Sequence, residues 1–165
     1  MLDNNLGRRM LVRVVRRLTV EEVHQKIKNF EKMLGMTFDE FEEFYLKKRV
    51  NKKLVDSYYE WASLVHAYRG YVESGELDYF IEELLDLTPS QMTLLTPKRL
   101  ELLYSLASLR IESMNDLAQK IRRNIKNVYG DLHVLKSLGF ITFKKQGKRN
   151  IVPETLVEEI TFLVR

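Results

Sequence analysis

Residues 113–150 constrain the fold more than any other part of the sequence, because two helix starts and a helix end follow one another closely. Ser113 can cap one helix, with Asp116 three residues later as a reciprocal acceptor, and Asn124 can cap a second helix. The second helix carries one apolar stripe at helical spacing: Ile125, Val128, Leu132 and Leu135. Gly139 stands where a helix needs a left-handed terminator. The pattern predicts two short helices joined by a basic turn.

A β-hairpin is expected after the second helix. Residues 140–143 are β-branched and aromatic, 146–150 form a polar tip that contains a glycine, and 151–152 are again apolar. Upstream, Thr96 and Pro97 predict the start of another helix, and residues 110–112 could add a third strand to the hairpin. We therefore expect a helix, a short strand, two helices and a hairpin, in that order.

This order resembles the winged helix-turn-helix domain of bacterial and archaeal transcription regulators, of the broad MarR-like and ArsR-like kind. The resemblance covers residues 96–165 and lies in pattern more than in invariant residues. It implies that helix 125–138 enters the major groove of DNA, while the hairpin, or wing, reaches the backbone or the adjacent minor groove. The residues that it places at the DNA surface are Arg122, Arg123, Asn124, Lys126, Asn127, Tyr129 and His133, with Lys144, Lys148 and Arg149 in the wing.

Gly130 does not fit the helix pattern, because it falls in the middle of the second helix on the face that should point outward. A glycine there costs about 1 kcal/mol relative to alanine. A close approach of the DNA backbone would explain it, and so would neutral drift.

Positive charge is concentrated in the same segment. Residues 122–149 hold eight Lys or Arg and one acid, Asp131, so this segment carries +7. Since the whole chain carries +4, the remainder carries −3. A basic helix and hairpin are typical of a phosphate-binding surface, although a solvated basic face without a partner is the alternative.

Composition excludes several other classes of protein. The chain has no cysteine, so disulfides, thiolate metal sites and thiol chemistry are excluded. It has neither an apolar run long enough to span a membrane nor a signal-peptide pattern, and we expect a cytoplasmic protein. Phosphate-binding glycine loops and nucleophile motifs are missing, and the three histidines are dispersed. We expect no enzyme activity, no metal and no cofactor.

The sequence pattern predicts a mostly helical N-terminal region, residues 1–95. Residues 10–18 are the exception, because they are rich in valine and arginine and predict a strand or an extended arm. Their arginines could track DNA phosphates or protect an edge strand. Capping boxes at Thr19 and Thr37 predict two helices, of which the second carries core aromatics: Phe38, Phe41, Phe44 and Tyr45.

A third N-terminal helix, residues 51–73, carries a stripe with heptad spacing: Leu54, Tyr58, Trp61, Val65, Tyr68 and Val72. The stripe could pack against the two preceding helices or form a dimer interface, to which we assign it, because regulators of this kind commonly bind two half-sites. A small-ligand pocket among its aromatics is a third alternative, without polar residues to support it.

The remaining segments complete a mainly α fold. Leucines around residues 77–85 predict a short helix, and residues 155–164 fit a helix although their β-branched content also permits a strand. The predicted architecture is a helical N-terminal region, 1–95, packed with a winged helix-turn-helix domain, 96–165, with a small hairpin wing.

The sequence predicts a homodimeric regulator of transcription that binds double-stranded DNA sequence-specifically, most simply a repressor that occludes a promoter. The alternative is a protein-interaction module, such as an antitoxin-like or complex-assembly protein whose N-terminal helices bind a partner protein. The two are compatible, because an antitoxin can bind DNA with one half and its toxin with the other.

Overall fold

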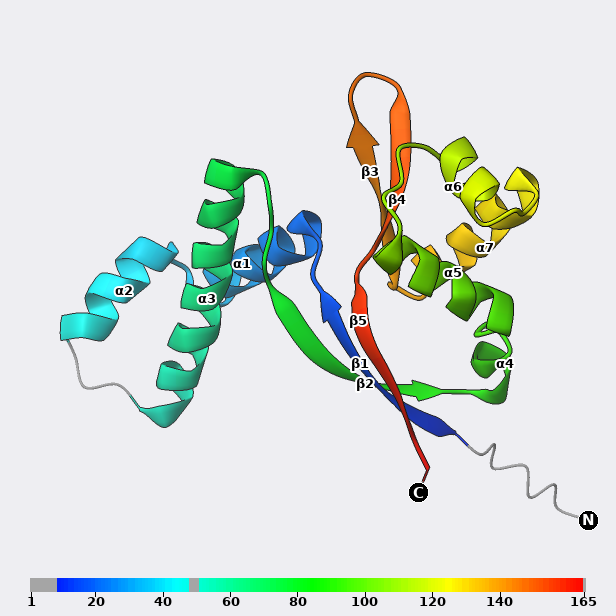
Figure 1. The fold of residues 1–165 in the computed structure, drawn as a ribbon. Coiled ribbons are helices and arrows are strands. Elements are labelled where there is room, and N and C mark those ends of the chain that lie inside the picture. The colour runs from blue at the N-terminus through cyan, green and yellow to red at the C-terminus, as the bar shows by residue number, and fades with distance from the viewer. Residues whose placement is uncertain (1–8, 48–50, 165) are drawn as a thin grey trace, which may run out of the picture. The chain divides into compact units, whose positions relative to one another are not determined.

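The computed structural model describes residues 9–47 and 51–164, which form two compact units (Figure 1). One unit combines the described residues up to Arg17 with those from Ile81 onward, and the other is Leu18–Phe80. The chain is therefore not divided at residue 95 as expected. The reason is a strand pairing between the two ends of the sequence, β1 (Met10–Arg17) with β5 (Val157–Leu163).

The expectation of a mainly α fold is wrong. Of the described residues, 55% are helical and 23% lie in strands. The first unit contains a three-stranded sheet in the order β2-β1-β5, in which β1 and β5 run antiparallel from Leu11 opposite Leu163 to Arg16 opposite Val157. β2 (Phe80–Leu87) replaces the helix predicted around residues 77–85, and its exposed residues alternate with more buried ones. β5 likewise replaces the C-terminal helix.

β1 lies in the middle of this sheet, so it is neither a free arm nor an edge strand. Its arginines form ion pairs with acids on other strands. Arg16 pairs with Glu83 of β2 at 2.9 Å, Arg13 with Glu159 of β5 at 2.6 Å, and Arg17 with Glu154 of β4 (Asn150–Thr155) at 2.6 Å. These ion pairs link β1 to β2 and β5 within the sheet and to β4 of the hairpin.

The helices after the sheet agree with the sequence pattern. α5 (Pro97–Ser108), α6 (Met114–Lys120) and α7 (Ile125–Ser137) each begin after a side chain that accepts a backbone N–H bond, namely Thr96, Ser113 and Asn124. A short helix, α4 (Pro89–Met92), precedes them. β3 (Ile141–Gln146) and β4 then form the expected antiparallel hairpin, and Gly139 is left-handed with a φ of 77°.

The third strand predicted for residues 110–112 is not present. The backbone N–H of Glu112 donates to the Asp116 carboxylate, and the carbonyl of Arg110 accepts from the Lys120 ammonium. Side chains of α6 thus bind the polar backbone groups that a strand would need for pairing.

The core of the first unit joins one face of the sheet to the helices and the base of the hairpin. Leu117, Val128, Leu132 and Leu135 are fully buried there with Val12 and Val14 of β1. α7 is consequently fixed along one side, and its opposite side is left at the surface.

The second unit consists of α1 (Val20–Leu34), α2 (Phe38–Lys47) and α3 (Lys52–Ser74). The capping box at Thr19 is present, and Thr37 and Glu40 exchange the corresponding bonds before α2. Of the expected core aromatics, Phe38 and Phe41 are buried, Tyr45 is half-buried and Phe44 is exposed.

Part of the heptad stripe of α3, assigned from the sequence to a dimer interface, packs within the chain. Trp61 is fully buried, with ring centroids 5.5, 5.4 and 5.3 Å from those of Phe30, Phe38 and Phe41. Its stripe neighbours follow the same pattern: Val65 is buried, Leu54, Tyr58 and Tyr68 are half-buried, and only Val72 is exposed. The buried Trp61 and Val65 thus belong to the core of this unit rather than to a dimer interface, whereas the other stripe residues keep some exposed surface.

Candidate nucleic-acid interface

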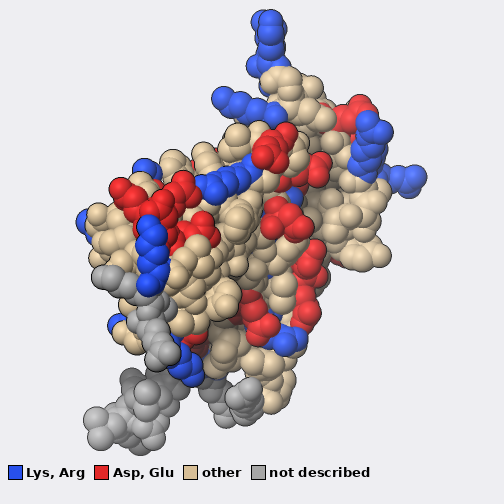
Figure 2. Space-filling model, turned by 90° about the vertical axis from the view of Figure 1, so that its left-hand side faces the viewer, with Lys and Arg blue, Asp and Glu red and all other residues tan. Residues whose placement is uncertain are grey.

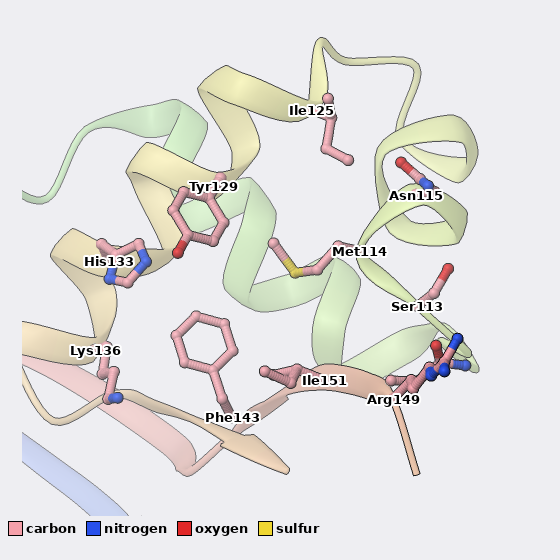
Figure 3. Close-up of a pocket in the computed structure, with 11 residues that line it drawn as sticks. Ser113, Met114, Asn115, Ile125, Tyr129, His133, Lys136, Phe143, Arg149 and Ile151 are labelled. Atoms are coloured by element: carbon pink, nitrogen blue, oxygen red, sulfur yellow. The ribbon is translucent and has the colours of Figure 1, made fainter. Parts of the chain in front are cut away.

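A groove of about 470 Å³ lies between α7, the start of α6 and the β3–β4 hairpin (Figure 3). Three of its lining residues, Tyr129, His133 and Lys136, project from α7 towards the hairpin, where Phe143 and Ile151 lie opposite them. The groove belongs to one unit, because α6, α7 and the hairpin all come from residues after Ile81.

The spacing of buried residues in α7 determines which side chains reach this surface. Since Val128, Leu132 and Leu135 bind the helix to the core, the outward side is made by residues at complementary positions of the 3.6-residue period. The exposed residues on this side include Lys126, Tyr129, Gly130 and His133, spaced i, i+3, i+4 and i+7. Asn127 is also exposed, but it is two residues from Tyr129 and therefore lies on the other flank of the exposed ridge.

Aromatic contacts hold the exposed side of α7 against the hairpin. The Tyr129 and His133 rings meet edge to face at 4.3 Å, and His133 lies 5.6 Å from Phe143 of β3. The Lys136 ammonium sits 5.2 Å from the centre of the Phe143 ring, within cation–π range. The helix and hairpin are thus joined by side-chain contacts, while the Tyr129 and His133 side chains remain accessible to a ligand.

The register of the hairpin decides which of its cations share the groove side. Phe143 lies opposite Pro153 and Lys145 opposite Ile151, so these four side chains share one face by strand alternation. Lys144, opposite Val152, belongs to the other face. Lys145 was missed by sequence reasoning, although counting in steps of two from Phe143 would have found it. Lys148 and Arg149 are exposed at the tip, and Arg149 lines the groove.

Two predicted DNA contacts have other roles in this structure. The Arg123 guanidinium binds the carboxylate of Asp131, which also accepts from Arg99 of α5 at 2.9 Å. These side chains are only 16–20% exposed, so Arg123 is held in a network that ties α5 to α7. Asn124 uses its side-chain carbonyl to cap α7, accepting from the Lys126 N–H at 2.9 Å.

Arg122 is exposed in the turn between α6 and α7 and has a left-handed backbone, with a φ of 53°. No other residue of the described ranges apart from glycine has a positive φ. Since a residue with a Cβ is strained there by about 1 kcal/mol, the turn places this side chain at an energetic cost.

The exposed cations of α7 and the hairpin differ from the arginines of β1 in having no acidic partner. Within the described ranges, no ion pair involves Lys126, Lys144, Lys145, Lys148 or Arg149. On the face in Figure 2, acidic side chains are widely spread, and Lys and Arg form no continuous patch. The surface of α7 and the hairpin thus offers positive charge that the protein does not itself neutralise.

The described residues offer neither a metal-binding cluster nor a membrane-spanning helix. The described part of the chain holds no group of three or more His, Cys, Asp or Glu side chains placed to bind a metal ion. None of the helices in the described ranges combines the length and the apolar character of a membrane span.

Comparison with known proteins gives one similarity. Residues 94–161 match the model of a protein family described as HVO_A0114. This match covers less than half of the chain and contains α5, α6, α7 and the whole hairpin, so it includes the entire groove. No match was found among curated proteins or among solved structures.

Proposed function

We propose that this protein binds double-stranded DNA through α7 and the β3–β4 hairpin, in the manner of a winged helix-turn-helix protein. The observation that carries the proposal is the set of exposed cations on these two elements that have no acidic partner in the described structure, in contrast to the paired arginines of β1. Phosphates are the natural counter-charge for such a surface.

The proposed geometry puts the exposed ridge of α7 into the major groove, with the hairpin tip on the backbone. Lys148 and Arg149 then neutralise phosphates irrespective of sequence. Lys126, Tyr129 and His133 on one flank of the ridge, with Asn127 on the other, are available to base edges.

The proposed biological role is regulation of transcription in the cytoplasm by a homodimer, most simply as a repressor. A dimer would use surface other than the buried part of the α3 stripe. Large apolar side chains on the second unit are exposed and available to a second copy or to another protein partner, namely Met33, Leu46, Tyr59 and Val72. This exposure also favours the second candidate function, a protein-interaction module, which is compatible with DNA binding by α7.

The test is the salt dependence of binding to a mixed-sequence duplex, followed by fluorescence anisotropy. We expect affinity to fall steeply with salt, and the double change Lys148→Ala and Arg149→Ala to lower the slope of log K against log salt by about 2. The matched control removes two cations of the second unit that pair with neighbouring acids, Lys28→Ala with Lys47→Ala, and should leave the slope unchanged. No duplex affinity at low salt, or an equal loss in both double variants, would refute the proposal.

Asn127 gives a test of sequence recognition. It is exposed and its side chain forms no hydrogen bond within the described residues, so its amide is available to an adenine edge. We expect Asn127→Ala to reduce discrimination at particular base pairs by about 1 to 3 kcal/mol. Affinities for a panel of single-base variants of a selected site would measure it, and a uniform loss across the panel would contradict the assignment.

A further inference from the structure

The groove beside α7 exposes several large apolar side chains, which a surface that binds only phosphate does not need. Ile125 is 42% exposed, Tyr129 53% and Ile151 50%. Ile125 belongs by its spacing to the buried stripe of α7, yet it lies at the groove, on the side of the helix that Tyr129 also occupies (Figure 3). Figure 3 also shows Ile151 and Phe143 of the hairpin across the groove from these two.

Arginine, the side chain whose paired donors make the commonest guanine contact, does not occur in α7. Guanine is recognised mainly by the paired donors of arginine or by lysine. The arginine nearest the start of α7, Arg123, is held by Asp131. Between Ile125 and Tyr129, only Lys126 carries a cation.

The major groove presents one apolar feature, the C5-methyl group of thymine, and apolar side chains are its usual partners. The first turns of a recognition helix are the part that reaches base edges. Ile125 and Tyr129 occupy positions i and i+4 of those turns in α7, and therefore lie on one side of the helix.

We propose that the groove between α7 and the hairpin reads thymine, with Ile125 and Tyr129 contacting its C5-methyl group and Ile151 closing the apolar surface from the hairpin. The inference rests on the proposed DNA-binding function and names the base class that this site selects. Lys136 and Arg149, which line the same groove, are placed to bind the flanking phosphates and so to fix the register of the helix on the duplex.

The test starts from duplexes that the full-length protein selects from a random pool. Each thymine of the selected site is replaced by uracil, which removes only the C5-methyl group. We expect about fourfold weaker binding at each contacted thymine, the equivalent of leaving one CH₂ group unburied. Replacing a contacted thymine–adenine pair by a cytosine–guanine pair should lower the affinity of the duplex. A 5-methylcytosine–guanine pair at the same position should restore part of that affinity.

Protein variants assign the effect to the groove. Ile125→Ala should bind the thymine and uracil duplexes equally, and Tyr129→Ala should lose most of the discrimination. Tyr104→Ala is the matched control, because Tyr104 is an exposed aromatic residue of α5 that does not line this groove. It should keep the full fourfold difference.

The outcomes separate the two proposals. Failure to select or bind any duplex overturns DNA binding and the thymine proposal together. Tight binding that none of the uracil replacements changes overturns the thymine proposal alone. A uracil effect that persists in Ile125→Ala and Tyr129→Ala also overturns it, because the methyl group would then act through DNA shape or another contact.

Discussion

Gly130 is exposed in the middle of α7, and a Cβ atom added there would have no atom within 4 Å. Neither packing nor a left-handed backbone requires glycine at this position, which lies on the same ridge as Lys126 and His133. A DNA backbone that approaches closely would require glycine here, because a Cβ atom would be in its way. Measuring stability and DNA binding together separates this explanation from neutral drift.

We predict that Gly130→Ala raises the free energy of unfolding by about 1 kcal/mol, because alanine restricts the unfolded chain and favours helix. The same change should weaken duplex binding, since the added methyl group faces the DNA. Urea denaturation and anisotropy measure the two effects. Gly70→Ala in α3 is the matched control, also without atoms near the added Cβ, and should gain stability without losing affinity. Unchanged affinity for Gly130→Ala would leave drift as the explanation.

Asp131 is the one acid in the basic segment, and two arginines share it. Asp131→Asn should lower the free energy of unfolding by about 1 to 2 kcal/mol, because charged hydrogen bonds in a mostly buried network are lost. Asp39→Asn, which removes one exposed ion pair with Arg69, should change it by less than about 0.5 kcal/mol. Equal effects in urea denaturation would show that the Arg99–Asp131–Arg123 network contributes no more than a surface pair.

At the scale of elements, helix starts could be predicted because their signals are local. Thr19, Thr96, Ser113 and Asn124 each accept a backbone N–H bond within the next few residues, so the sequence neighbourhood is enough. The strands β2 and β5 could not be predicted in this way. The apolar residues of β2 and β5 fit a helix as well as a strand, and pairing with β1, remote in sequence, decides between them.

The pairing of β1 with β5 has a consequence for pH dependence. Hydrogen bonds from the Thr161 hydroxyl and the Arg13 guanidinium hold the pKa of Glu159 below its ordinary value. A lowered pKa in the folded state stabilises the fold above the unfolded value, about 4.3, and this contribution is lost as pH falls through the folded pKa.

We therefore predict that Glu159→Gln makes stability less sensitive to acid below about pH 4. Urea midpoints between neutral and acid pH would show a shallower fall for this variant than for the unchanged protein. Glu158→Gln makes the same change of charge at the neighbouring residue and should keep the original fall. A Glu159→Gln profile parallel to that of the unchanged protein would contradict the assigned pairing.

At the scale of the whole molecule, the sequence located the candidate interface but not its detailed composition. Helical spacing and charge were sufficient to select α7 and the hairpin. The face on which Lys145 lies follows from strand alternation once Phe143 is placed at the groove. The engagement of Arg123 by Asp131 depends on how α5 packs against α7, which residue spacing along the chain does not encode.

The same distinction applies to the second unit. Its stripe has heptad spacing, but Trp61 is already buried against Phe30 of α1 and the aromatic rings of α2, so Trp61→Glu should unfold the three helices rather than dissociate a dimer. Large aromatic truncations in a core cost about 3 to 5 kcal/mol, and a buried charge adds to that. Loss of helical circular dichroism and of thermal stability would be expected. A fully folded variant that only sediments more slowly would restore the stripe as an interface between copies.

The central claim is that α7 and the hairpin are the surface that meets DNA. The most direct measurement is the change in backbone amide chemical shifts of the full chain as a selected duplex is added. We predict the largest changes in α7 around Lys126 to His133 and at the hairpin tip around Lys148, with small changes in α1, α2 and α3. Changes concentrated in those three helices, or none at saturating duplex, would contradict the claim.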